Sequence, residues 1–316
     1  MNKNCSSCLD GPEGSEKTRH RLGVYALDHF VRDVPDIAAA EPFFRALGLR
    51  TRRQEGALTV QAGAVDHDWA VITQGPHARL RRLSFATYPP DVAALRQRAA
   101  GTAYEILSET PDSFVLSGPD GIEVEIVARD RQMFDAVEAN KPPLVPAVAQ
   151  HKSQVIMPEA LRLSHIAIFT SDVPRALDFY TNVVGLARSD RSGDTLAFLH
   201  APHGSDHHVL ALVKSFGPGV HHYSLDLGSI DAIGLTADNA HAQGYTAGWG
   251  FGRHVLGSNF FHYIRDPWGS HAELTAGLEY IAANEEWIAG DHPADDAFYL
   301  WGPAPPADFI ENHQTP

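Results

Sequence analysis

The sequence predicts an α+β protein of two duplicated domains, each a set of short strands and helices that curls around a cavity. Short alternating or apolar runs bounded by turn residues recur along the chain, and such runs are typical of strands. The order of strand, helix and several strands repeats within each half. At 316 residues, with 44% hydrophobic and 20% charged residues, the chain is long enough to build two ordinary soluble domains.

The first half contains six predicted strands and two predicted helices. Both helices, at residues 36–47 and 91–100, are followed by a glycine that stops them, Gly48 and Gly101. The strands are short runs at residues 25–31, 58–62, 69–73, 82–87, 114–117 and 122–127.

The second half repeats this plan. Its helices are predicted at residues 174–184 and 229–243, with Gly185 and Gly244 at their ends. Its strands are predicted at residues 163–170, 196–199, 208–214, 222–227, 260–265 and 271–275.

Composition suggests where the two domains begin and end. The proline-rich segment near Pro142 and Pro143 cannot lie inside a helix or a sheet, so it is read as a surface connector. The predicted division is a flexible N-terminal tail 1–20, a first domain 21–130, a connector 131–160, a second domain 161–278, and a C-terminal extension 279–316 that could act as a lid.

Charge and cysteine content exclude several classes of protein. The net charge of −14 comes without a basic stripe, which argues against nucleic acid and anionic membranes as partners. No apolar run reaches the ~18 residues of a spanning helix, and the N-terminus lacks the apolar core of a signal peptide, so we expect a cytoplasmic protein. Cys5 and Cys8 are either half of a zinc site or free thiols, and no second pair completes a four-thiolate site.

The two halves match at the start and at the end of each domain. Leu27-Asp28-His29 and the helix after it correspond to Leu163-Ser164-His165 and its helix. The segment that ends in Glu125 corresponds to the segment that ends in Glu273. The domains are therefore predicted to be duplicates.

Three residues of the second domain form a potential metal site. His165, His222 and Glu273 each lie on a predicted strand, and two neutral imidazoles with one carboxylate make the facial set that binds non-haem Fe(II) while leaving positions open. Either histidine alone would more simply be a core histidine with a backbone partner, and the glutamate alone an edge-strand charge. Their matched positions in one repeat favour a metal.

The first domain has Arg82 where the second has His222. A guanidinium is always protonated and cannot ligate a cation, so only the second domain should bind metal. Glu125 is the expected ion-pair partner of Arg82. Neighbouring histidines, among them His207 and His221, are predicted to face the other side of their strands.

Five elements in a fixed order connect the chain with a known family: Leu163-Ser164-His165, Asp206-His207-His208, Val220-His221-His222, Phe251-Gly252-Arg253-His254, and Tyr263 ten residues before Glu273. In these elements, the chain resembles the type I extradiol ring-cleavage dioxygenases of the vicinal oxygen chelate superfamily. The resemblance extends from about Arg21 to Gly277.

The resemblance implies a fold of paired βαβββ units and a chemistry. It implies Fe(II), with Mn(II) possible, bound by His165, His222 and Glu273, and O2-dependent opening of a catechol ring beside its hydroxyls, in the breakdown of aromatic compounds. It assigns an acid/base role to His208, places His254 and Tyr263 at the substrate, and leads us to expect a homo-oligomer. After His254 the chain departs from the polar run of the biphenyl-diol branch, so the pocket for the ring substituent need not match that branch.

Other functions stay open at this point. His208 and His254 could be packed surface histidines, and Tyr263 an ordinary strand aromatic. The same superfamily includes glyoxalase-like isomerases and metal-dependent transferases, whose ligands usually come from different modules, and non-catalytic binding or resistance proteins.

Overall fold

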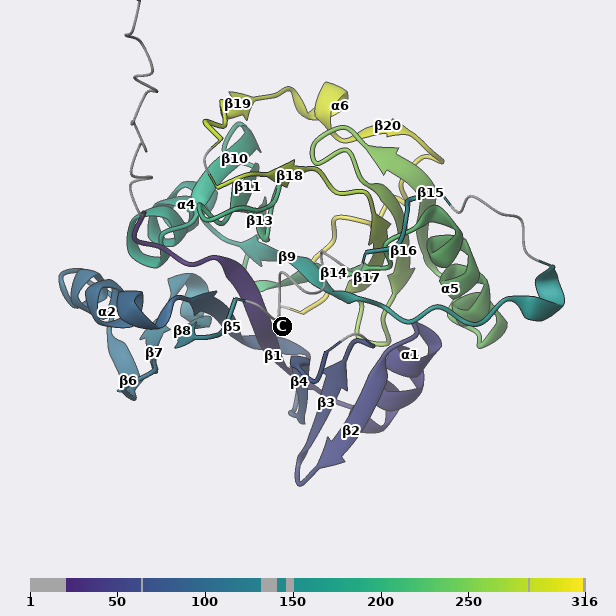
Figure 1. Cartoon of the computed structure of the whole chain (residues 1–316), viewed down its shortest axis with the longest axis horizontal. Helices are drawn as coiled ribbons and strands as arrows, with labels where there is room; N and C mark the ends of the chain where they lie inside the picture. The colour runs from purple at the N-terminus through teal and green to yellow at the C-terminus, as the bar shows by residue number, and fades with distance from the viewer. Residues whose placement is uncertain (1–20, 64, 132–140, 146–150, 284, 315–316) are drawn as a thin grey trace, which may run out of the picture.

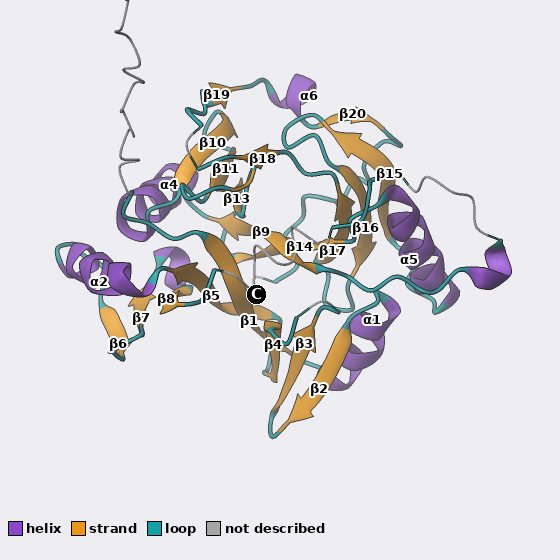
Figure 2. Cartoon of the chain, viewed as in Figure 1, coloured by secondary structure: helices purple, strands orange, loops and turns teal. Residues whose placement is uncertain are grey.

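The computed structural model describes residues 21–63, 65–131, 141–145, 151–283 and 285–314. The predicted tail with Cys5 and Cys8, and residues 132–140 and 146–150 of the predicted connector, lie outside the described residues. Within them the chain folds into two large curved sheets (Figure 1) with the main helices outside the strands (Figure 2). This confirms the predicted α+β class. No described helix is long and apolar enough to cross a membrane.

The first sheet has eight strands in the order β2-β3-β4-β1-β5-β8-β7-β6. Two βαβββ units build it, one from β1 to β4 with α1 (Ala40–Ala46) and one from β5 to β8 with α2 (Val92–Ala100). They join where β1 pairs antiparallel with β5. The strands are β1 (Ala26–Val34), β2 (Arg50–Gln54), β3 (Ala57–Gln61), β4 (Asp68–Gln74), β5 (Arg79–Thr87), β6 (Ile106–Glu109), β7 (Ser113–Ser117) and β8 (Glu123–Ala128).

The second sheet repeats this arrangement around the antiparallel pair β9 and β14, in the order β19-β10-β11-β13-β9-β14-β17-β16-β15-β20. Its helices are α4 (Val173–Phe179), which continues into a π-helical turn Tyr180–Val184, and α5 (Ile230–Ala242). The strands of its two units are β9 (Arg162–Thr170), β10 (Ala187–Ser192), β11 (Leu196–His200), β13 (Leu210–Lys214), β14 (Gly219–Asp226), β15 (Gly248–His254), β16 (Phe260–Arg265) and β17 (His271–Ala276).

Side chains at the helix starts explain why helices begin there. Asp172 accepts a hydrogen bond from the Arg175 backbone N–H at 3.0 Å, and Ser229 accepts one from Ala232 at 3.2 Å. Such caps satisfy backbone donors that the first turn leaves free. The predicted helix at 36–47 is a 3-10 turn capped by Asp36 and followed by α1.

The C-terminal extension adds strands to both outer edges of the second sheet. It contains β18 (Tyr280–Ile281), which pairs with β12 (Ser205–Asp206), and then β19 (Gly290–Asp291), α6 (Ala294–Ala297) and β20 (Tyr299–Trp301). Strand β19 pairs with β10 and β20 with β15, so the yellow end of the chain spans the open side of this sheet (Figure 1). Such pairing covers sheet edges that would otherwise present unpaired backbone groups.

Strand register confirms how the two halves correspond. In the first sheet Ser84 lies opposite His29 on one neighbouring strand and opposite Glu125 on the other. In the second sheet Ser224 lies between His165 and Glu273 in the same way. The repeat read in the sequence is therefore a repeat of strand positions.

The prediction that Arg82 pairs with Glu125 is wrong. Its guanidinium pairs with Glu123, with Nη2 2.7 Å from Oε2, and both side chains are about one-third exposed. Glu123 lies directly opposite Arg82 in the parallel register, whereas Glu125 lies opposite Ser84, whose hydroxyl donates to it at 2.6 Å. Glu125 lies on an inner strand, since β8 lies between β5 and β7.

The two modules share a continuous hydrophobic core and a buried ion pair. The fully buried Arg32 on β1 contacts Asp266 at 2.5 Å and Ser270 at 2.9 Å, in the turn between β16 and β17. Asp266 also accepts hydrogen bonds from the backbone of Trp268 and Ser270, each at 2.9 Å. A first-module cation thus stabilises the turn before the strand that carries Glu273.

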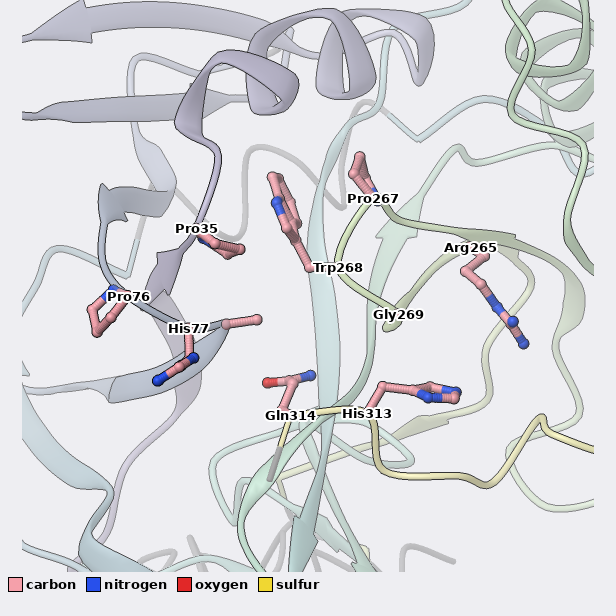
Figure 3. A pocket seen from close by; sticks show the side chains of 10 residues that line it. Pro35, Pro76, His77, Arg265, Pro267, Trp268, Gly269, His313 and Gln314 are labelled. Atoms are coloured by element: carbon pink, nitrogen blue, oxygen red, sulfur yellow. The ribbon is translucent and has the colours of Figure 1, made fainter. Parts of the chain in front are cut away.

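A separate crevice of about 440 Å³ lies near this turn, between Pro35 and Trp268 (Figure 3). Its basic side chains do not converge. The His77 side chain points to one side of the crevice, and the side chains of Arg265 and His313 lie on the other (Figure 3). The crevice therefore presents no common set of donors for a ligand.

Candidate metal centre

Five of the six predicted site residues lie on neighbouring strands in the middle of the second sheet, and the sixth lies just before the next strand. His165, His222 and Glu273 lie on the adjacent strands β9, β14 and β17. Tyr263 and His254 follow on β16 and β15, and His208 lies just before β13 on the other side of β9. The sheet order therefore brings together residues up to 108 positions apart in the sequence.

His165, His222 and Glu273 converge on one point. His165 Nε2 lies 3.2 Å from His222 Nε2 and 2.9 Å from Glu273 Oε2, and His222 Nε2 lies 3.6 Å from Glu273 Oε2. Among the described residues these three are the group of histidines, cysteines and acids whose ligand atoms come together in this way. Two ligand atoms about 2.1 Å from one ion at a right angle would lie ~3 Å apart, so this spacing fits a metal.

Both histidines make hydrogen bonds through Nδ1, which in a neutral ring leaves the lone pair on Nε2. Ser164 Oγ donates to Asp206 at 2.9 Å, so its oxygen accepts from His165 Nδ1 at 3.3 Å. His222 Nδ1 lies 2.6 Å from His221 Nδ1, and the His221 ring bonds to the Phe309 backbone. Hydrogen bonds at Nδ1 that orient Nε2 toward a metal are the usual support of histidine ligands.

The two oxygens of the Glu273 carboxylate have different surroundings. Oε1 accepts a hydrogen bond from Asn259 Nδ2 at 3.0 Å and lies 3.6 Å from His254 Nε2. In the described part of the chain, the buried Oε2 meets no donor in hydrogen-bond geometry. A buried oxygen without a donor, beside two imidazole lone pairs, fits a cation that completes the group.

Burial sets the protonation of the centre. It holds the pKa of His222 well below its usual range, with the Glu273 charge opposing this in part. Burial acts to raise the pKa of Glu273, but His165, His254 and His222 outweigh it and lower that pKa well below its usual range. Neutral imidazoles and an ionised carboxylate are the forms that bind metal.

His208 lies against His165, with ring centroids 4.1 Å apart. Burial, and then His165, hold its pKa well below the usual range. Both residues line a cavity of about 460 Å³. His208 is placed to exchange a proton with a molecule in that cavity.

His254 and Tyr263, which also line this cavity, form a hydrogen-bonded pair. His254 Nδ1 donates to the Phe298 carbonyl at 2.8 Å, so in the neutral ring Nε2 accepts from the Tyr263 hydroxyl at 2.9 Å. Burial, with the Glu273 charge adding to it, raises the pKa of Tyr263 well above its usual range. The phenol therefore stays protonated.

The rest of the cavity wall is mostly apolar. Lys214 is the single lysine or arginine among the described lining residues, and its ammonium donates to the Ser171 carbonyl. The C-terminal extension supplies part of the wall. The apolar lining residues are Ala167, Leu196, Phe198, Ala211, Val213, Leu256, Ala294, Ala297, Phe298, Phe309 and Ile310.

Sequence reasoning missed two features of the centre. His221 was predicted to face away, yet it lines the cavity, because β14 has a register irregularity between Val220 and His222 that disturbs the alternation. Asn259 was not identified as a partner of Glu273. The available signal was a pair of polar residues, Ser258 and Asn259, directly before the aromatic strand at 260–265.

The equivalent place in the first module is closed by hydrogen bonds. His29 Nδ1 lies 2.7 Å from Asp28 Oδ2, and Ser84 Oγ donates to Glu125 at 2.6 Å. His29 Nε2 lies 4.0 Å from Glu125 Oε2. Among the described residues of this module, no third potential metal ligand lies close to both.

Known proteins with similar sequences and folds cover nearly the whole chain. Residues 162–274 match the model of the glyoxalase/bleomycin resistance protein/dioxygenase superfamily. Metapyrocatechase 2 of Cupriavidus necator is 42% identical, over 94% of this chain and 95% of that relative.

Two solved structures share the fold. The Mn(II)-bound glyoxalase from Novosphingobium aromaticivorans has a TM-score of 0.74 at 24% identity, covering 90% of this chain and 93% of its own. A variant of homoprotocatechuate 2,3-dioxygenase from B. fuscum has a TM-score of 0.73 at 19% identity, covering 92% and 81%. At these identities the likeness concerns the fold.

Proposed function

The chain belongs to the type I extradiol dioxygenases of the glyoxalase/bleomycin resistance protein/dioxygenase superfamily, and from this premise we propose that it opens a catechol ring beside the diol with O2 at one Fe(II). We propose His165, His222 and Glu273 as the ligands. The observation that carries the proposal is the convergence of their ligand atoms, which lie 2.9 to 3.6 Å from one another, at the cavity. Mn(II) is the alternative ion for the same donors.

The donor set explains what the protein contributes to the reaction. When bound, the ion supplies Lewis acidity, open positions for a diol and O2, and a path for electrons between them. His208, beside His165, takes a proton from a diol hydroxyl and returns it to the oxygen on which negative charge develops. Tyr263 stays protonated, and when a substrate oxygen enters the cavity its O–H turns from His254 Nε2 to donate to that oxygen.

The apolar wall supports a substrate class. A buried carboxylate would need a cation or several donors, whereas Lys214 is already bound to the Ser171 carbonyl. Phe198, Leu256 and Phe309 offer contact to a ring or an alkyl group. We propose catechol itself, or a catechol with a compact apolar substituent, as the substrate in the breakdown of aromatic compounds.

Oxygen uptake tests the function. Anaerobically iron-loaded protein should consume O2 with catechol and methylcatechol and form a yellow ring-opened product, while carboxymethyl catechol should react poorly. His222→Ala should lose both bound iron and turnover with little change in far-UV circular dichroism. A fully iron-loaded His222→Ala variant would exclude the ligand set.

The same assay separates the alternatives. An isomerase or transferase of this superfamily would convert its substrate without O2, and a binding protein would bind a catechol without product. The expected homo-oligomer and cytoplasmic location stay predictions, and the first is measured by size-exclusion chromatography with light scattering.

A further inference from the structure

A line of buried polar side chains leads away from the cavity behind His208. His208 Nδ1 lies 3.1 Å from His207 Nδ1, and His207 Nε2 lies 2.8 Å from Asp190 Oδ2. The exposed fractions are 4% for His208, 1% for His207 and 4% for Asp190. Neither His207 nor Asp190 is among the described residues that line the cavity, so both can reach a substrate only through His208.

The C-terminal extension holds the Asp190 carboxylate in place. Strand β19 pairs with β10 at this position, and Asp190 Oδ1 accepts from the Gly290 backbone N–H at 2.7 Å. The same oxygen lies 2.9 Å from Nε2 of the partly exposed His292. Burial acts to raise the pKa of Asp190, but hydrogen bonds from His207, Gly290 and His292 outweigh it and lower the pKa. The carboxylate is therefore ionised and only accepts hydrogen bonds.

The Asp190 carboxylate, which accepts hydrogen bonds at one end of this line, determines which nitrogen of each imidazole carries the proton. Because Asp190 accepts, His207 donates from Nε2, and when the ring carries this one proton its Nδ1 is an acceptor. Nδ1 of His208 must then donate to it, which leaves Nε2 of His208 unprotonated. A base that takes a proton from a diol needs this tautomer.

We propose that Asp190 and His207 are positioning residues that hold His208 in the tautomer whose Nε2 accepts a proton from the substrate. This inference rests on the proposed ring cleavage. It gives the extension a role besides lining the cavity, because Gly290 orients the carboxylate.

Asp190→Asn tests the inference sharply, because Gly290 decides how the new amide is turned. Its carbonyl oxygen stays with the Gly290 N–H, so its NH₂ group faces His207 Nε2 and reverses both tautomers. We expect kcat to fall by ~10² or more, the scale of a lost acid/base group, with KM and metal content unchanged. Asp291→Asn is the matched control, since Asp291 lies next along β19 and pairs with the exposed Arg191.

A double-mutant cycle distinguishes positioning from a purely structural effect. If Asp190 acts through His208, Asp190→Asn should cause no further loss in a His208→Gln background. His207→Phe is a second variant that should fold, because the ring packs between Phe198 and Trp287, and it should show the same loss of kcat. The inference would be overturned if the double variant lost kcat by the product of the two single losses, or if Asp190→Asn kept the wild-type kcat.

Imidazole 15N NMR of the Zn(II)-loaded protein reads the tautomer directly, whether or not the enzyme turns over. His208 should be protonated at Nδ1 in the wild type and at Nε2 in Asp190→Asn. Protonation of His208 Nε2 in the wild type would refute the inference. Absence of turnover with every catechol would instead refute the proposed function.

Discussion

Replacing Asn259 by leucine should weaken metal binding although no ligand is removed. Asn259 is 1% exposed, and its Nδ2 donates to Glu273 Oε1 at 3.0 Å and to Thr275 Oγ1 at 2.7 Å. Leucine has the same number and branching of heavy atoms, so the change removes hydrogen bonds while it keeps the shape of the side chain. Glu273 Oε1 would keep only the contact with His254 at 3.6 Å, and the carboxylate would be free to turn.

The size of the effect follows from these contacts. A hydrogen bond to a charged group contributes ~1.5–3 kcal/mol. Since 1.4 kcal/mol corresponds to a factor of ten, the dissociation constant of the metal should rise by about 10 to 150-fold. Loss of a residue that orients a metal ligand typically costs a comparable 10 to 100-fold in affinity, by order of magnitude.

Competition with a chelator measures the dissociation constant, with Zn(II) and anaerobic Fe(II) as the ions. Asn312→Leu is the matched control, because this buried amide donates to the Gly217 carbonyl at 3.0 Å and has no contact with Glu273. It should lower stability and leave metal affinity unchanged. An unchanged affinity in Asn259→Leu, or an equal loss in Asn312→Leu, would refute this explanation of how Glu273 is oriented.

Three further predictions concern the site and its support. His208→Gln should keep the metal and bind catechol but lower kcat by ~10² or more, which single-turnover kinetics can measure; loss of the metal would place His208 among the ligands. His29→Ala should leave elemental analysis at one metal per chain, because the first module has Arg82 in place of a third ligand, and two metals in the wild type would contradict this. Arg32→Met should lower the free energy of unfolding by ~3–5 kcal/mol in urea titration, since it leaves the buried Asp266 without its cation. A loss below about 1 kcal/mol would show that the ion pair does not stabilise the fold.

The repeat was readable because duplication preserved residue types at equivalent strand positions. His29 and His165 begin their modules in the same local context, and register then fixes Ser84 and Ser224 beside them. The candidate ligands were found in the same way, as residues of metal-binding type at matched ends of one repeat. Two strands escaped the pattern for different reasons: β2 is a mostly polar edge strand that needs little burial, and β15, between β16 and β20, contains Gly248, Gly250 and Gly252.

The sequence by itself determined the α+β class, the duplicated plan and the three candidate ligands, since these depend on local periodicity and residue type. The tertiary structure alone decided which partners meet across the sheet. Arg82 bonds Glu123 because parallel register places them opposite each other, and Asn259 reaches Glu273 because β16 lies beside β17. Likewise Asp190 reaches His207 only after β19 has paired with β10, and no local pattern encodes a contact that depends on the packing of distant strands.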